Sequence, residues 1–328
     1  MRQAKRQREE SEKANPSIRL RTTIPSIILC NSNRNVSAKH WQREINSVNL
    51  HNSHKYVVNK SMNTFKPYTI NLGGRLIDVN RPLVMGILNV TPDSFCADII
   101  DIGGYSSRPM ADDISPEEEF RRLSIGMKAV RKLLPYIPVS IDTFRASVAE
   151  RCITEFGPVI VNDISGGQLD EAMIPTVGKL HVPYILMHMR GNPHTMTSLT
   201  DYNGQLTASI LRFFGEQVRK ATHAGIADII LDPGFGFSKT LEQNYELLAS
   251  LEAIKALELP ILVGVSRKSM IYKLLHTTPE YALNGTTVVN TIALLHGASI
   301  LRVHDVREAA EAVKIVLEFD KNKPSTQE

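Results

Sequence analysis

Eight short apolar runs rich in Val and Ile alternate with longer segments of helical spacing between residues 84 and 318. Such alternation predicts a parallel sheet whose strands are joined by helices, and eight strands are the number that closes a (β/α)8 TIM barrel. We expect strands at 84–90, 98–103, 138–142, 158–163, 183–188, 228–232, 260–264 and 299–303. We expect helices at 116–133, 144–155, 169–180, 204–224, 241–256, 281–296 and 306–318.

Only seven residues, Thr91 to Ala97, separate the first two predicted strands. Parallel neighbours need a crossover of a dozen or more residues, so the first crossover helix is expected to be missing. Seven extended residues reach about 23–25 Å, and a short strand is about 17–20 Å long. A return outside the barrel is therefore possible, but it would leave apolar flanks of both strands exposed. The alternative is that the first strand fails to dock.

Two segments of alternating polarity, 68–72 and 75–79, precede the barrel pattern. Gly73 and Gly74 lie between them and can adopt the positive φ that a two-residue hairpin turn requires. We expect an N-terminal β-hairpin that caps the barrel floor. Because one barrel commonly needs about 250 residues, residues 62–328 are expected to form a single domain.

Residues 1–61, the leader, hold twelve Lys and Arg against four Asp and Glu, so the leader carries +8 of a chain total of +4 and the rest carries −4. Its Asn- and Ser-rich sequence without a sustained period predicts disorder. A solvated tail is favoured over a nucleic-acid-binding arm. It is also favoured over a transit peptide, which Glu9, Glu10 and Glu12 disfavour. Translation from Met62 is a further hypothesis.

Several classes of protein are disfavoured by the sequence. No apolar run approaches the roughly 18 residues of a membrane span. Cys30, Cys96 and Cys152 show no metal or redox spacing. We expect a soluble, cytoplasmic protein that acts on small molecules and has neither a membrane nor a nucleic-acid partner.

Polar residues interrupt the apolar pattern where the predicted strands end, which is the end at which barrel enzymes build their active sites. Those on the first five strands are Asn89, Ser107, Arg108, Asp142, Asn162, Asp163, His188 and Arg190. The last three strands add Asp232, the run Ser266-Arg-Lys-Ser269, Arg302 and His304. One such residue is more often a cap, but a series from all eight strands predicts a site.

Four of these residues suit a flat heterocycle that presents donors and acceptors. Carboxylates can accept two hydrogen bonds from a 2-amino pyrimidine edge, an amide both donates and accepts, and an ammonium can meet a ring carbonyl. The four are Asp142, Asn162, Asp232 and Lys268.

Five further residues suit an anion such as a diphosphate. Arginine offers bidentate geometry to phosphate, and an amide oxygen is a plausible Mg²⁺ ligand beside it. This group comprises Asn89 as the metal ligand, with Ser107, Arg108, Arg302 and His304.

The run Gly234-Phe-Gly-Phe237 follows Asp232 directly. Glycines there would let the backbone approach a ligand closely, and Phe237 could wall a planar substrate, although such a run alone more often marks a tight turn. Met187 could line the same apolar side of the site. His188 is interpreted as a core or cap residue in preference to a ligand contact.

The combined motifs resemble the dihydropteroate synthase family from about Tyr68 to the last helix. They are Met85-Gly-Ile-Leu-Asn-Val-Thr-Pro-Asp-Ser-Phe95, Asp98-Ile-Ile-Asp-Ile-Gly103 with Ser107-Arg-Pro109, Ser140-Ile-Asp-Thr143, Asn162-Asp-Ile-Ser165, Met187-His-Met-Arg190, Leu231-Asp-Pro-Gly-Phe-Gly-Phe237, Ser266-Arg-Lys-Ser269 and Arg302-Val-His-Asp305. The resemblance implies a homodimeric enzyme that condenses 4-aminobenzoate with (7,8-dihydropterin-6-yl)methyl diphosphate, with Mg²⁺ as cofactor.

The resemblance also implies a role for each site residue. Asp142, Asn162, Asp232 and Lys268 would hold the pterin between Met187 and Phe237; Asn89 would bind the metal; Ser107, Arg302 and His304 would bind the diphosphate; Arg108, Pro109, Phe237 and Ser269 would lie near the aminobenzoate. Lys268, Arg302 and His304 would be the catalytic residues.

Three departures from the family pattern bear on activity. Ser107 stands where Thr is common, and Met110 replaces a Gly. After Phe95, an acidic, Gly-rich loop and the first barrel helix are missing. A catalytically defective pterin-binding protein is therefore the first alternative, and pterin binding is expected to survive better than catalysis. A pterin-dependent methyltransferase is the second, and it has no reason to carry both Ser266-Arg-Lys-Ser269 and the motif at Arg302.

Overall fold

The computed structural model of this chain describes residues 65–88, 96–106 and 112–323. The leader and the possible start at Met62 lie outside these ranges. So do four residues with predicted roles, Asn89, Ser107, Arg108 and Pro109.

Eight parallel strands form one sheet in the order β8-β7-β6-β5-β4-β3-β10-β9. The edge strands β8 and β9 meet through a parallel bridge between Leu231 and Ile261, so the sheet curls into a near-closed barrel. The parallel-barrel prediction is confirmed. The strands are β3 (Leu83–Ile87), β4 (Ile99–Gly103), β5 (Val139–Asp142), β6 (Ile160–Asp163), β7 (Tyr184–Met187), β8 (Ile229–Asp232), β9 (Leu262–Val263) and β10 (Ile300–Val303).

The short connection does not prevent the first barrel strand from docking. Strand β3 pairs in parallel with β4, Met85 opposite Ile99, and with β10 on its other side, Ile300 opposite Leu83. Arg81 and Asp98 join the chain on the two sides of the connection by a bidentate ion pair of 2.7 and 3.0 Å. Asp98 also accepts a hydrogen bond from the Val84 amide. The alternative of an undocked first strand is therefore wrong.

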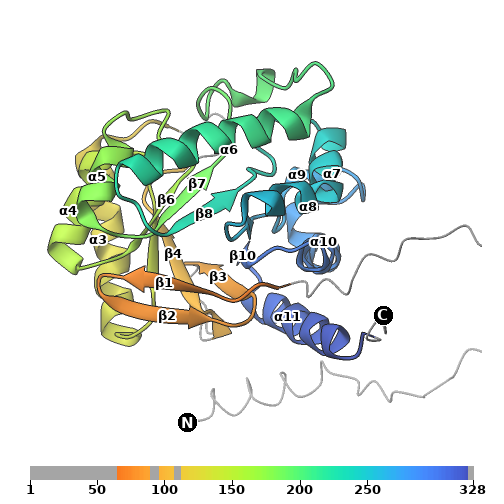
Figure 1. The fold of residues 1–328 in the computed structure, drawn as a ribbon, viewed down its shortest axis with the longest axis horizontal. Coiled ribbons are helices and arrows are strands. Elements are labelled where there is room, and N and C mark those ends of the chain that lie inside the picture. The colour runs from red at the N-terminus through yellow and green to blue at the C-terminus, as the bar shows by residue number, and fades with distance from the viewer. Residues whose placement is uncertain (1–64, 89–95, 107–111, 324–328) are drawn as a thin grey trace, which may run out of the picture. The chain divides into compact units, whose positions relative to one another are not determined.

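Helices follow each later strand and lie outside the barrel (Figure 1). The longer ones are α3 (Pro116–Leu133), α4 (Ala146–Phe156), α5 (Met173–Leu180), α6 (Leu206–His223), α7 (Leu241–Ala249), α10 (Leu283–Leu295) and α11 (Val306–Lys321). Short turns complete the set: η2 (Met196–Ser198), α8 (Leu251–Ile254), η3 (Lys255–Leu257), α9 (Ser269–Tyr272) and η4 (Pro279–Tyr281). Within the described ranges, no helix is both long and apolar enough to cross a membrane.

Neighbouring helices cover the strands that flank the short connection. Helix α3 packs against β4 and α11 against β3, which leaves Val84, Ile100 and Ile102 at most 3% exposed. The prediction that the short connection leaves the flanks of these strands exposed is therefore wrong for these side chains. What remains is a cavity of about 290 Å³ beside α11, lined partly by Cys96 and Val313.

The hairpin closes the amino-terminal end of the barrel, as predicted. Strands β1 (Tyr68–Leu72) and β2 (Arg75–Val79) pair antiparallel around two glycines with φ of 61° and 88°. Ile70, Leu72 and Val79 are buried against a layer of inward-facing strand residues. That layer consists of Met85, Ile99, Ile160, Ile185, Ile230, Leu262 and Ile300. The polar site can therefore lie only toward the opposite end of the barrel.

Candidate active site

A cavity of about 860 Å³ opens where β8, β9 and β10 end. Four predicted site residues line it, namely Lys268, Ser269, Arg302 and His304. Among the described residues, its other charged lining side chains are Lys239, Arg267, Lys273 and one acid, Glu280. The excess of cationic side chains suits an anionic ligand.

Arg302 reaches across the barrel interior from β10 to two carboxylates. Its Nε donates to Asp101 Oδ2 at 2.7 Å, and its Nη2 donates to Asp142 Oδ2 at 2.7 Å. Burial alone lowers the pKa of Arg302, but the two carboxylates outweigh it and raise that pKa. The guanidinium therefore stays charged, and most of its charge is already neutralised.

Asp142 ends β5 and keeps 15% side-chain exposure. Burial raises the pKa of its carboxyl to about 7, against the lowering effect of Arg302 and with a further contribution from Asp101. Asn162 lies one strand further and donates a long hydrogen bond of 3.5 Å to Asp101. These groups together form a polar layer above the apolar barrel floor.

Lys268 and Asp232 complete this layer on the far side. Lys268 Nζ donates to the Phe235 carbonyl at 2.6 Å and lies 4.8 Å from the centre of the Phe237 ring. Burial lowers the pKa of Lys268 to about 8 despite the nearby Asp232 carboxylate. Burial also raises the pKa of Asp232, which Lys268 partly offsets. The pair brings opposite charges to the place where a heterocycle edge would sit.

The glycine run after β8 forms a tight turn between the strand end and this layer. Gly234 has φ of 73°, and a Cβ there would lie 2.0 Å from the His188 carbonyl oxygen. Gly236 has φ of 79°, and its Cβ would lie 3.2 Å from the Lys268 side chain. Only glycine fits both positions, so the turn brings Phe237 close to Lys268.

A buried lysine that the sequence did not single out holds the same turn. Lys239 Nζ donates to the carbonyls of Gly234 and Phe237 at 2.9 and 3.0 Å, and it lies 3.2 Å from His188 Nδ1. Burial lowers the pKa of Lys239 to about 7. His188 is 3% exposed and packs edge-on against Phe213, as expected of a core residue.

Met187 and Phe237 share an apolar cluster with Ile164, Met189 and Met196 beside the polar layer. This cluster is built from the ends of β6 and β7 and the turn after β8. It places an apolar wall next to the hydrogen-bonding groups, which is the combination that a flat heterocycle requires.

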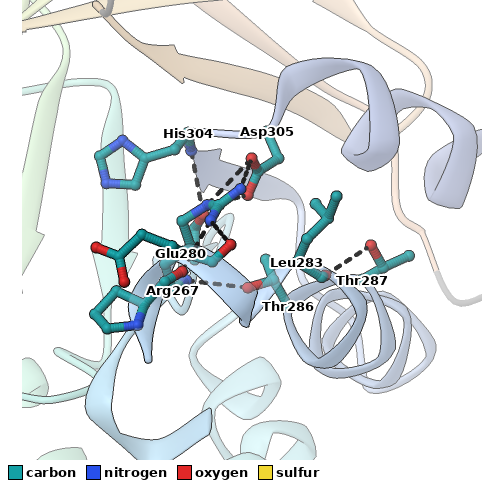
Figure 2. A network of polar contacts seen from close by, with 9 residues as sticks. Arg267, Glu280, Leu283, Thr286, Thr287, His304 and Asp305 are labelled. Carbon is teal, nitrogen blue, oxygen red and sulfur yellow. Dashed lines mark hydrogen bonds and ion pairs between the residues drawn. The ribbon is translucent and has the colours of Figure 1, made fainter. Parts of the chain in front are cut away.

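Arg267 fixes the loop that carries Lys268 and Ser269 (Figure 2). Its backbone has φ of 53°, and its amide donates a hydrogen bond to Thr286 Oγ1. Its guanidinium donates to both carboxylate oxygens of Asp305, with Nε and Nη2 distances of 2.9 and 2.8 Å. Its Nη1 also donates to the carbonyls of Pro279 and Glu280. The guanidinium therefore links the ends of β9 and β10.

No group of three or more His, Cys, Asp or Glu side chains in the described residues could hold a metal ion. The predicted Mg²⁺ ligand, Asn89, lies outside the described ranges. The magnesium site therefore stays a prediction.

Asp101 and Lys239 are functional candidates that sequence reasoning missed. Asp101 follows Ile99 by two residues on β4. The period of two therefore places both on the inner face, and a charged residue there was a usable signal. Lys239 carried no such signal, because it lies in an irregular turn.

A near-closed parallel barrel with charged groups gathered above an apolar floor has the architecture of a small-molecule enzyme. The model of the family described as pterin binding enzyme matches residues 96–304, beginning within the short connection. A dihydropteroate synthase from Synechocystis is 42% identical over 280 residues, covering 77% of this chain and 96% of its own. The Escherichia coli K12 enzyme of that name is 39% identical, covering 74% and 93%.

Solved structures agree with these relatives. The Yersinia pestis dihydropteroate synthase, in a sulfonamide drug complex, has a TM-score of 0.72 at 36% identity and covers 78% of this chain and 100% of its own. The Thermus thermophilus enzyme in complex with 4-aminobenzoate has a TM-score of 0.69 at 36% identity, covering 76% and 99%. The chain therefore belongs to the pterin-binding enzyme family, and within it to the dihydropteroate synthases, which are transferases.

Proposed function

We propose that this chain binds (7,8-dihydropterin-6-yl)methyl diphosphate and 4-aminobenzoate and joins them to give dihydropteroate and diphosphate. The observation that carries the proposal is the polar layer above the barrel floor. Asp142, Asn162, Asp232 and Lys268 come from four different strand ends and lie around one apolar wall. These are the donors, acceptors and wall that an aminopyrimidine ring needs.

The cationic cavity beside this layer would take the anionic parts of both substrates. Lys268 and Arg267 contribute positive charge there, and Ser269 and His304 add further polar groups. An aromatic amine needs no strong base to attack an electron-poor methylene carbon, so the main demand on the protein is to bind and orient charge. In this proposal Lys268 meets the ring carbonyl while Arg302 and His304 receive the leaving diphosphate.

Magnesium belongs to the proposal as well. Asn89 would hold it as a protein ligand beside the diphosphate, as Mg²⁺ is commonly held in phosphate sites. Its chemistry would be to neutralise charge on the leaving group. Homodimer formation and a cytoplasmic location are likewise part of the proposal.

The short connection favours one alternative, a protein that binds pterin without turnover. A calorimetric titration with the pterin diphosphate, combined with a release assay for diphosphate in the presence of 4-aminobenzoate, separates the two. Binding with product formation supports the synthase. Saturable binding without product supports the alternative, and an absence of binding would sink both.

A further inference from the structure

Asp101 is the most deeply buried charged group of the polar layer, at 0% side-chain exposure, and no predicted role accounts for it. It lies on β4 between the strands that carry Arg302 and Asp142, because β4 pairs with β3 and β5, and β3 pairs with β10. Its Oδ2 accepts from Arg302 and its Oδ1 from Asn162. Asp101 thus contacts two of the groups assigned to the ligand.

The two carboxylates that share Arg302 are not equivalent. Asp101 is inaccessible, whereas Asp142 keeps 15% side-chain exposure at the end of its strand. A ligand can therefore compete for Asp142 only. If Asp142 turns its acceptors to a pterin edge, Arg302 loses one of its two partners.

The Arg302 side chain is only 21% exposed. A guanidinium with so little access to water is disfavoured without a carboxylate, because most of its lost hydration is not replaced. With Asp101 in place, Arg302 keeps its ion pair with Asp101 while Asp142 binds a ligand. Without it, Arg302 would hold Asp142 as its sole partner, and a pterin would have to break that pair.

Resting on the proposed function, we infer that Asp101 is a positioning residue that anchors Arg302 in the barrel and so frees Asp142 to bind the pterin ring. Asp101 acts through Arg302 and touches no substrate itself. Held in this way, Arg302 stays beside the bound ring and does not pair with the Asp142 carboxylate that the ring needs.

The test is a double-mutant cycle read by the affinity for 6-hydroxymethyl-7,8-dihydropterin, which lacks the diphosphate and so reports on the ring alone. Asp101→Asn keeps the shape of the side chain and removes its charge. We expect this variant to bind the pterin at least tenfold more weakly. In an Arg302→Gln background, the same substitution should change affinity less than twofold, since the guanidinium it anchors is gone.

The matched control is Asp98→Asn, which removes a carboxylate from the same stretch of chain and breaks an ion pair of the same length, with Arg81 at 2.7 Å. It lies at the other end of the strand, so affinity should stay within twofold. An equal loss for Asp98→Asn and Asp101→Asn would overturn the inference. So would an equal effect of Asp101→Asn in both backgrounds, which would mean that Asp101 does not act through Arg302.

A second readout separates this inference from the proposed function. If the unsubstituted chain binds no pterin, the proposed function fails, and the carboxyl signal of Asp142 in a ¹³C NMR titration then decides about Asp101. Asp101, Glu119 and Asp163 raise the pKa of Asp142, and Arg302 lowers it. Asp101→Asn should therefore shift the midpoint to lower pH, and by less in an Arg302→Gln background, where no guanidinium can close onto Asp142. An equal shift in both backgrounds would overturn the anchoring role.

Discussion

Asp142 links the fold of the barrel to the proposed binding of the pterin. It is the last residue of β5, its carboxylate pairs with Arg302, and its pKa is raised because it is buried. Its presence in a site could be predicted from its place at a strand end. Its partner could not, because Arg302 lies 160 residues away and only the closed barrel brings the two together. The same holds for Asp101, whose separation from Arg302 is 201 residues.

Pterin affinity should depend on pH through Asp142. In the proposed function the carboxylate form accepts the hydrogen bonds of the ring, and burial raises the pKa of Asp142 to about 7. Binding below that pH must displace a proton, so affinity should fall as the pH drops, by up to about tenfold per unit. Above pH 7 it should level off. Fluorescence titrations between pH 5.5 and 8.5 measure this dependence.

The control for this profile is Asp228→Asn at the barrel floor. Burial raises the pKa of Asp228 too, and its Oδ2 accepts from the Asn71 amide. This variant should keep the pH profile, and Asp142→Asn should flatten it at weak affinity. A flat profile in the unsubstituted chain would contradict the assignment of Asp142. The stability of the fold should depend on pH in the opposite direction. Because the pKa of Asp142 is higher in the folded than in the unfolded chain, its contribution to stability should fall as the pH rises from about 4 to 7.

At the scale of elements, local chemistry decided where prediction succeeded. Both hairpin strands and α3 have the predicted bounds, because paired glycines fix the turn and Ser115 caps α3 by accepting from the Glu118 amide at 3.2 Å. The predicted helix 241–256 instead breaks at Ser250 into α7, α8 and η3. No Gly or Pro marks that break. The strands from β4 to β10 start one or two residues later than predicted, whereas the ends of β4, β5, β6, β8 and β10 match the prediction.

The two hairpin glycines should respond differently to substitution by alanine. Both have positive φ, which costs an alanine about 1–2 kcal/mol. At Gly73 the added Cβ would also lie 2.1 Å from Pro158 Cγ, whereas at Gly74 it would meet nothing within 4 Å. Overpacking against a proline ring adds about 1–3 kcal/mol. Urea unfolding should therefore show a larger loss for Gly73→Ala, and equal losses would mean that the hairpin does not pack on Pro158.

At the scale of the whole molecule, the last helix, α11, covers the strand that precedes the short connection. Val313 of α11 is 3% exposed and lines the cavity beside β3, two residues before Ile315, which is 66% exposed. The shortness of the connection was predictable by counting residues between strands. Its consequence was not, because how α3 and α11 cover the neighbouring strands depends on their packing in the closed barrel.

Substitution of these two neighbours by aspartate tests that dependence. Val313→Asp buries an unpaired charge next to the strand at the short connection, and we expect it to cost more than about 4 kcal/mol or to prevent folding. Ile315→Asp should change stability by no more than about 0.5 kcal/mol. Thermal unfolding followed by circular dichroism compares them. Similar melting temperatures would show that α11 does not cover this face.

The junction between β8 and β9, where the barrel closes, links ligand binding to the stability of the fold. Strand β9 has two residues, and a bridge at Leu231 and Ile261 joins it to β8. Asp232 ends one side of that junction, and Lys268 follows the other. A molecule that hydrogen-bonds to both residues would join β8 to the segment after β9, across a junction that a single bridge holds. Occupancy of the site and integrity of the barrel would then rise and fall as a single equilibrium.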